Sequence, residues 1–179
     1  MRIIAGEFKG RRLKAPNWQG LRPTSDKLRE TLFNIVMPRV AEARVLDVFA
    51  GTGAMGLESL SRGASRAVFI EHDARAAGLI AENVALCGAS DRCVIIRDSA
   101  ERALQRHIDV NFFDLVVLDP PYAFEPLDAV IGAAARHLAP GGLLILEHAS
   151  RRVVPPIDGV RAVRTVRSGD SALTMFEAR

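Results

Sequence analysis

The stretch from Leu46 to Glu58 constrains the fold of this chain more than any other. It contains an apolar run, a turn rich in glycine and the beginning of a helical pattern. Gly51, Gly53 and Gly56 fit the spacing G-x-G-x-x-G, in which glycine lets the backbone turn sharply and approach a ligand closely. The N–H groups at the start of the next helix would face that ligand. The stretch therefore predicts a strand–turn–helix unit with a nucleotide-type site.

Apolar runs and helical patterns alternate along the rest of the chain. We expect strands at 45–49, 66–71, 93–97, 113–118 and 142–147, and helices at 54–62, 73–87, 99–107 and 126–138. This alternation predicts an α/β fold with a doubly wound, Rossmann-like and mostly parallel sheet. Two further strands, 160–166 and 172–178, are separated by a Gly169-Asp170 turn and should pair as an antiparallel C-terminal hairpin.

The N-terminal region differs in pattern from this core. Residues 1–24 predict a small basic arm or hairpin, and residues 25–179 the main domain. A helix should begin near Ser25 or Asp26 and end before Pro38. We expect Lys27 and Arg29 to lie off its apolar face. That face should consist of Leu28, Leu32, Ile35 and Val36.

Composition bounds the class of protein. A chain of 179 residues with 49% hydrophobic residues is long and apolar enough for one domain with a core. No apolar run reaches the roughly 18 residues that span a bilayer, and the first residues lack a signal-peptide core. We therefore expect a cytoplasmic protein. Cys87 and Cys93 have no matching His or Cys pair, so reduced structural thiols are expected and a metal site is not.

Basic charge gathers at the two ends of the chain. Residues 1–30 carry eight Lys/Arg against three acids, residues 31–149 ten against fifteen, and residues 150–179 six against three. A localised basic segment attracts a polyanion such as RNA, although a solvated surface is the plainer interpretation. Trp18 lies in the basic segment and could stack on a base or hold the arm against the body.

Acids follow the predicted strands directly. Glu71 comes twenty residues after Gly51, where doubly wound sheets place an acid for ribose hydroxyls, and Asp98 and Asp119 follow later strands. Ligands of such sheets bind outside the carboxyl ends of the strands. We therefore expect Gly51–Gly53 and these three acids to cluster along one edge.

The sequence Asp119-Pro120-Pro121-Tyr122 indicates the chemistry of that edge. Two prolines fix the backbone and remove two N–H donors, so the turn is rich in acceptors. Asp119 and the Pro120 carbonyl can accept the hydrogens of an exocyclic NH2, and Tyr122 can stack on its ring. Such acceptors tolerate the positive charge that grows on a nitrogen as it attacks carbon.

The core from Leu46 to Glu147 resembles class I S-adenosylmethionine-dependent methyltransferases, and residues 119–122 resemble the (D/N)-P-P-(Y/F) motif of amine methylation. The segments 2–6, 9–13 and 22–34 are similar to the bacterial RsmD family of 16S rRNA guanine-N2 methyltransferases. Many relatives with the related motif carry Asn in place of Asp119, but an acid is normal in this branch.

The resemblance implies a role for each matching position. The glycine loop would hold the methionine half of S-adenosylmethionine, Glu71 the ribose, and residues 98–99 the adenine, while the Asp119 to Tyr122 turn receives a flipped guanine. The cofactor set is Asp47, Phe49, Ala50, Gly51, Thr52, Gly53, Glu71, His72, Asp98 and Ser99. The catalytic set is Asp119, Pro120, Pro121 and Tyr122.

The implied reaction is direct in-line transfer, in which guanine N2 attacks the sulfonium methyl. The substrate would be 16S rRNA in the small subunit or in an assembly intermediate, bound by a monomer that needs no metal or membrane. Basic residues of the arm and first helix would bind RNA phosphates; alternatively, residues 24–26 close over the cofactor. This RNA-binding set is Lys9, Arg11, Arg12, Lys14, Arg22 and Lys27.

Three alternatives remain open. A nicotinamide dehydrogenase could use the same glycine turn, although no hydride-accepting constellation is evident. A methyltransferase could act on another exocyclic amine, in adenine of DNA or RNA or in a glutamine side chain. A third alternative is a non-catalytic RNA-binding module. His72, His107, His137 and His148 have no partner that the sequence identifies.

Overall fold

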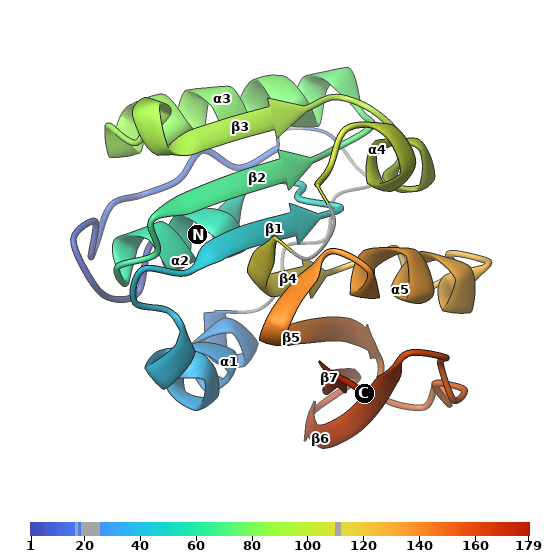
Figure 1. Ribbon diagram of the computed structural model, residues 1–179. Helices are drawn as coiled ribbons and strands as arrows, with labels where there is room; N and C mark the ends of the chain where they lie inside the picture. The colour runs from blue at the N-terminus through green and yellow to red at the C-terminus, as the bar shows by residue number, and fades with distance from the viewer. Residues whose placement is uncertain (17, 19–25, 110–111) are drawn as a thin grey trace.

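The computed structural model describes residues 1–16, 18, 26–109 and 112–179 (Figure 1). A seven-stranded sheet forms its centre, in the order β3-β2-β1-β4-β5-β7-β6. Strands β1 to β5 are parallel, β7 is antiparallel to β5, and β6 is antiparallel to β7. The predicted α/β class and the C-terminal hairpin are therefore confirmed. The strands are β1 (Arg44–Val48), β2 (Arg66–Ile70), β3 (Cys93–Ile96), β4 (Phe113–Leu118), β5 (Leu138–Ala149), β6 (Val160–Ser168) and β7 (Ser171–Ala178).

Helices cover both faces of the sheet (Figure 1). Helices α1, α2 and α3 contribute to one hydrophobic core, and α4 and α5 to the other. No helix among the described residues is long and apolar enough to cross a membrane. The helices are α1 (Asp26–Val36), α2 (Ala54–Ser61), α3 (Ala74–Cys87), α4 (Ala100–Arg106) and α5 (Leu127–Ala135), with short 3-10 turns η1 (Met37–Arg39) and η2 (Ser90–Arg92).

Alternation along the strands produces these two cores. On β1, Val45 packs in the core of α1 to α3, and Leu46 and Val48 pack in the core of α4 and α5. Successive side chains of a strand point to opposite faces, so a strand covered on both sides is apolar throughout. Asp47 interrupts this run, because it is a carboxylate that is 1% exposed. A buried acid in a central strand marks the part of the sheet that differs from plain packing.

The N-terminal arm packs on the same core as α1 to α3. Arg2 and Arg12 form an isolated antiparallel bridge. The apolar side chains Ile3, Phe8 and Leu13 are buried in the core that α1, α2 and α3 share. The first fourteen residues are thus fixed by hydrophobic contacts, which hold their basic side chains at defined places.

Helix α1 begins and ends as predicted, but the prediction for one of its arginines is wrong. Arg29 is 0% exposed, although we expected it off the apolar face. Its Nη2 donates to the Arg2 carbonyl at 2.5 Å and to Asp26 at 3.1 Å, and its Nε lies 3.8 Å from Glu58. The Arg2 carbonyl and the carboxylates of Asp26 and Glu58 offset the burial of this charge, while Nε and Nη1 have no hydrogen-bond partner among the described residues.

Glu58 is the centre of what we call the arm cluster, which consists of Arg29, Glu58 and Arg62. Both of its oxygens accept backbone N–H groups of the arm, from Ile4 at 2.8 Å and from Ala5 at 3.1 Å. Arg62 Nε donates to the same carboxylate at 2.7 Å. The arm, α1 and α2 are therefore joined through one buried carboxylate that follows the glycine loop.

Candidate active site

The turn between β1 and α2 takes the conformation that its glycines permit. Gly53 has φ +75°, and Phe49 has φ +64°, which is uncommon for a residue with a side chain. A Cβ on Gly56 would lie 2.3 Å from Cε1 of Phe69 on β2. The third glycine of the motif therefore lets α2 lie against the sheet, as in dinucleotide-binding turns. Ala50, Gly51 and Thr52 complete the turn and are buried.

Asp47 lies beneath this turn. Its Oδ2 accepts the N–H of Gly56 at 2.9 Å. The pKa of Asp47 is raised from 3.8 to about 8, chiefly by burial and also by the charges of Asp119 and Glu71, while the Gly56 hydrogen bond opposes the shift. Three acids at the carboxyl ends of β1, β2 and β4 are thus close enough to influence one another. We call Asp47, Glu71 and Asp119 the edge acids.

Glu71 joins two of the elements that surround the edge. Its Oε2 accepts the Gly51 N–H and its Oε1 accepts the Asp73 N–H, both at 2.9 Å. Asp73 in turn caps α3 by accepting from Arg75 and Ala76, as the sequence predicted. Glu71 is 6% exposed, so the carboxylate that joins these elements is buried. His72, which follows it, is exposed with Nδ1 3.1 Å from Glu71 Oε1.

Asp98 and Ser99 follow β3 and cap α4. Asp98 Oδ1 accepts the Ser99 N–H at 2.8 Å and Arg102 Nε at 2.7 Å. The Ser99 N–H and Arg102 hold the pKa of Asp98 below its ordinary value of 3.8, so this side chain is a carboxylate. Ser99 Oγ accepts the Arg102 N–H at 3.3 Å. The pair shapes the loop at the β3 end of the same edge.

The Asp119 to Tyr122 turn is held from both sides. The Asp119 N–H donates to the Val48 carbonyl at the end of β1, at 3.3 Å. Tyr122 Oη lies 2.6 Å from Ser171 Oγ, at the start of β7. Arg152 Nη1 donates to the Tyr122 carbonyl at 2.9 Å. The turn that ends β4 is therefore attached to β1 on one side and to the C-terminal hairpin on the other.

Several residues that shape this turn were not identified from the sequence. Phe124 donates its N–H to the Pro121 carbonyl at 2.8 Å, and its ring meets Phe49 edge to face at a centroid distance of 4.9 Å. Arg152 and Ser171 act on Tyr122 from 30 and 49 residues away. Their only signal in the sequence is position, since Arg152 follows β5, the neighbour of β4, and Ser171 begins β7, the neighbour of β5.

His148 has partners, although the sequence identified none. Its Nε2 lies 2.9 Å from Thr174 Oγ1, and Thr174 Oγ1 lies 3.0 Å from Thr165 Oγ1, so a polar row crosses β5, β7 and β6. Burial lowers the pKa of His148. His137 Nδ1 and Nε2 lie 3.0 Å and 2.8 Å from the Asp109 and Leu104 carbonyls. Both histidines thus fasten elements of the fold.

The basic residues of the arm lie along α3. Arg11 Nη1 donates to the Leu86 carbonyl, and Lys14 Nζ lies 2.7 Å from Glu82. Helix α3 begins close to Glu71. At a rise of 1.5 Å per residue, Leu86 lies about 16 Å along the helix axis from Arg75. Arg11 is therefore at the end of α3 that is remote from the edge acids. Lys9, Arg12 and Lys27 are exposed, and Arg22 lies outside the described residues.

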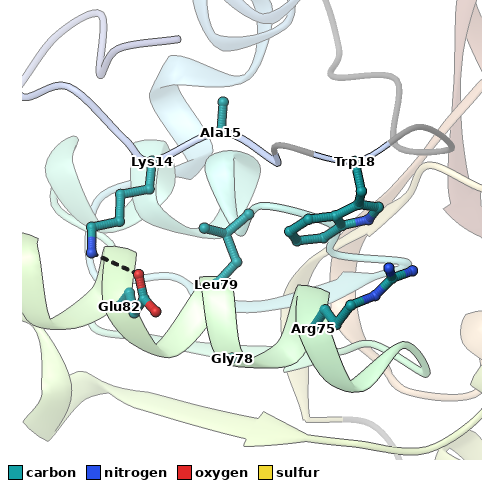
Figure 2. A pocket seen from close by; sticks show the side chains of 7 residues that line it. All are labelled: Lys14, Ala15, Trp18, Arg75, Gly78, Leu79 and Glu82. Atoms are coloured by element: carbon teal, nitrogen blue, oxygen red, sulfur yellow. Dashed lines mark hydrogen bonds and ion pairs between the residues drawn. The ribbon is translucent and has the colours of Figure 1, made fainter.

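Trp18 lies nearer the edge end of α3. The Arg75 guanidinium carbon lies 5.0 Å from the Trp18 ring centroid, within cation–π range. Figure 2 shows the ring beside Arg75 and Leu79, with Lys14 paired to Glu82 one to two turns further along the helix. This contact holds the arm against α3, one of the two roles considered for Trp18. The pocket between arm and helix has a volume of about 590 Å³ and is lined by Lys14, Ala15, Trp18, Arg75, Gly78, Leu79 and Glu82.

Other predicted features can be placed briefly. Cys87 is buried and Cys93 half-buried, both are free, and burial raises the pKa of Cys93 to about 12. Across the described ranges, no group of three or more His, Cys, Asp or Glu side chains is arranged to hold a metal ion.

The fold and this edge define a class, the methyltransferases with a Rossmann-like sheet. The first relatives are enzymes of that kind. "Ribosomal RNA small subunit methyltransferase D" of Haemophilus influenzae is 38% identical over 150 residues, which cover 82% of this chain and 78% of the relative. The Escherichia coli protein of the same name is 41% identical over 122 residues, which cover 68% of this chain and 60% of the relative.

A solved structure and a family model complete the assignment. The Escherichia coli protein yhhF superimposes with a TM-score of 0.87 at 32% identity, covering 99% of this chain and 97% of that one. The family model described as "Conserved hypothetical protein 95" matches residues 1–177. The chain belongs to this family, the RsmD family of methyltransferases.

Proposed function

We propose that this protein transfers a methyl group from S-adenosylmethionine to the exocyclic N2 of a guanine in 16S ribosomal RNA. The observation that carries the proposal is the meeting of the edge acids at the ends of β1, β2 and β4, beside a rigid Asp119-Pro-Pro-Tyr turn. Two curated relatives named for small-subunit ribosomal RNA support the substrate class.

The edge acids fit a cationic cofactor. Asp47 and Glu71 are buried, and no lysine or arginine in the described ranges forms an ion pair with either. A buried acid of raised pKa gains from a nearby positive charge, which favours its ionised form. Bound S-adenosylmethionine would supply the methyl group and a positive sulfonium. Glu71 would accept from the ribose hydroxyls, the turn at 49–53 would bind the methionine half, and residues 98–99 would border the adenine.

The β4 turn would position the guanine. Tyr122 offers its ring as a stacking surface, and its hydroxyl bond to Ser171 fixes that ring. Asp119 would accept a hydrogen bond from the guanine amino group and stabilise the positive charge that would develop on N2 as its bond to the methyl carbon forms, the bond from methyl to sulfur breaks and S-adenosylhomocysteine leaves. Pro120 and Pro121 remove donors from the turn, so the amino group faces acceptors only. These residues would hold the amino nitrogen in position for methyl transfer from the bound cofactor.

The test is mass mapping of 16S rRNA from cells with and without this protein. The proposal expects one N2-methylguanine to disappear, and to return when the chain is supplied again. Loss of a methyladenine, or of a methylated glutamine in a ribosomal protein, would assign a different amine to the same site. Calorimetry with S-adenosylmethionine and NADH separates a methyltransferase from a dehydrogenase. Unchanged RNA and protein in the deletion strain would contradict the proposal.

A further inference from the structure

The C-terminal hairpin brings arginines to the edge that carries the candidate active site. Strand β6 is antiparallel to β7, and β7 is antiparallel to β5, so β6 ends at the same edge as β1 to β5. Arg167, the penultimate residue of β6, pairs with Ala172 of β7, which pairs with His148 of β5. Arg151 follows the end of β5 by two residues. The two arginines therefore occupy one corner of the sheet.

Neither arginine is used by the fold. Both are exposed, and among the described residues neither has an ion pair or side-chain hydrogen bond. The neighbouring Arg152 is different, because it pairs with Glu125 and holds the Tyr122 carbonyl. The adjoining hairpin turn contains Asp170, which is exposed and whose backbone carbonyl accepts the Ser150 N–H at 2.8 Å. The corner thus carries two exposed arginines and one exposed acid.

A hydrogen bond connects this corner to the Asp119 to Tyr122 turn. The hydroxyl of Tyr122 bonds Ser171, the first residue after the hairpin turn, at 2.6 Å. Strand β6 is three strand spacings from β4, or about 14 Å, which a few nucleotides of RNA can span. In Figure 1 the hairpin lies at the opposite end of the sheet from β3. An RNA strand that leads from the Asp119 to Tyr122 turn toward the hairpin would pass over this corner.

The N-terminal arm is less suited to contacts close to the target base. Arg11 and Lys14 are engaged by α3, and Arg11 lies at the end of that helix remote from the edge acids. Contacts to phosphate fix the register of a nucleic acid, and they do so best from side chains that are free and near the reacting base. Arg151 and Arg167 meet both conditions.

We propose that Arg151 and Arg167 bind phosphates of the RNA strand that adjoins the target guanine, so that the C-terminal hairpin forms the second wall of the substrate site. The inference rests on the proposed function, since it assumes that the target base of the RNA binds beside Tyr122. It assigns the basic C-terminal segment a role separate from the N-terminal arm. Both arginines act as positioning residues for the known class of reaction.

The test compares two double variants of the whole protein. R151A/R167A removes the two edge arginines, and R136A/R161A removes two exposed arginines, one after α5 and one at the start of β6, at the opposite edge. Affinity for the small subunit and for a 16S rRNA hairpin is measured between 50 and 200 mM salt. Each lost phosphate contact in single-stranded RNA reduces the slope of log affinity against log salt by about 0.7.

In R151A/R167A, the slope of log affinity against log salt should fall by about 1.4. The KM for RNA should rise. The KM for S-adenosylmethionine, and kcat at saturating RNA, should stay within about twofold of wild type. The control should keep the wild-type slope. Equal slopes for the two variants would overturn the inference. A wild-type protein that methylates no rRNA would refute the proposed function instead, so the two failures are distinguishable.

Discussion

The arm cluster and the edge acids are two groups of polar side chains near the glycine loop, and the partners of their carboxylates differ. In the arm cluster, the carboxylate of Glu58 meets two arginines and two backbone N–H groups. In the edge acids, carboxylates meet backbone N–H groups and one another, and the pKa of Asp47 is raised to about 8. Two arginines meet the carboxylate of the first cluster, whereas no lysine or arginine among the described residues forms an ion pair with Asp47 or Glu71.

The difference separates stability from function. A buried carboxylate with cations and donors around it holds segments together, because removing it leaves unpaired charges behind. A buried carboxylate without such a cation stores unfavourable free energy that a positively charged ligand can relieve. Substitutions in the arm cluster should therefore affect folding most, and substitutions in the edge acids should affect ligand binding most.

The largest expected effect is on stability, from Glu58→Ala. It leaves Arg29 and Arg62 buried without their carboxylate and frees two arm N–H groups, so the free energy of unfolding should fall by about 3–5 kcal/mol. Urea unfolding measures it. Glu82→Ala, which breaks only the exposed pair with Lys14, should change stability by less than about 1 kcal/mol. Equal losses for both variants would remove the contrast between clusters.

Glu71→Gln should act on the cofactor more than on the fold. The amide offers one acceptor oxygen where the carboxylate offers two, so the ribose hydroxyls and the Gly51 and Asp73 N–H groups would share one neutral acceptor and the cofactor would lose a hydrogen bond to a charged group. A hydrogen bond to a charged group contributes about 1.5–3 kcal/mol, which predicts roughly tenfold to a hundredfold weaker binding of S-adenosylmethionine by calorimetry. Glu101→Gln, on the exposed side of α4, is the matched control. Equal affinity in both variants would argue against a ribose role.

Asp47→Asn should remove a pH dependence. Below about pH 8 the free protein holds a proton on Asp47, and a bound cation favours its release, so affinity for S-adenosylmethionine should rise between pH 6 and 8, by up to about tenfold per unit. The asparagine variant should give a flatter profile. Because the folded-state pKa is raised, wild-type stability should also fall as pH rises from about 4 to about 8. A wild-type profile that is already flat would contradict the raised pKa.

The smallest expected effect is that of Tyr122→Phe. It keeps the ring and removes the hydroxyl bond to Ser171, so kcat/KM should fall by about twofold to tenfold, as expected for a bond of about 0.5–1.5 kcal/mol. Ser171→Ala should give a similar loss, and the double variant should be no worse than either single one. Additive losses in this cycle would show that the hairpin does not act through Tyr122.

The sequence predicted the parts of this fold that depend on local pattern. Buried parallel strands are continuous apolar runs, and the helices between them have clear boundaries, so the order of elements and the hairpin were predictable. Strand β5 is longer than predicted, because Leu138 already pairs with Phe113 before the irregularity at Leu115. For the same reason α5 ends at Ala135, earlier than expected.

Long-range compensation could not be predicted. Arg29 has a helical position that is indistinguishable from that of a solvated arginine, and its burial depends on the Arg2 carbonyl, 27 residues earlier, and on Glu58, 29 residues later. The same holds for Arg152 and Ser171, whose contacts with Tyr122 depend on the order of β5, β7 and β6. Glycine and acid positions of the candidate site were predictable, since each follows a strand and parallel strands end at one edge.

The most direct test of the account is methyl transfer by Asp119→Ala. Single-turnover methylation of small subunits that lack the methyl group would be followed by mass mapping, with unfolding and S-adenosylmethionine affinity measured on the same preparation. If Asp119 receives the amino group of guanine, the rate should fall by about a hundredfold to a thousandfold while the protein stays folded and binds the cofactor. A folded variant that methylates the same guanine at the wild-type rate would contradict the account.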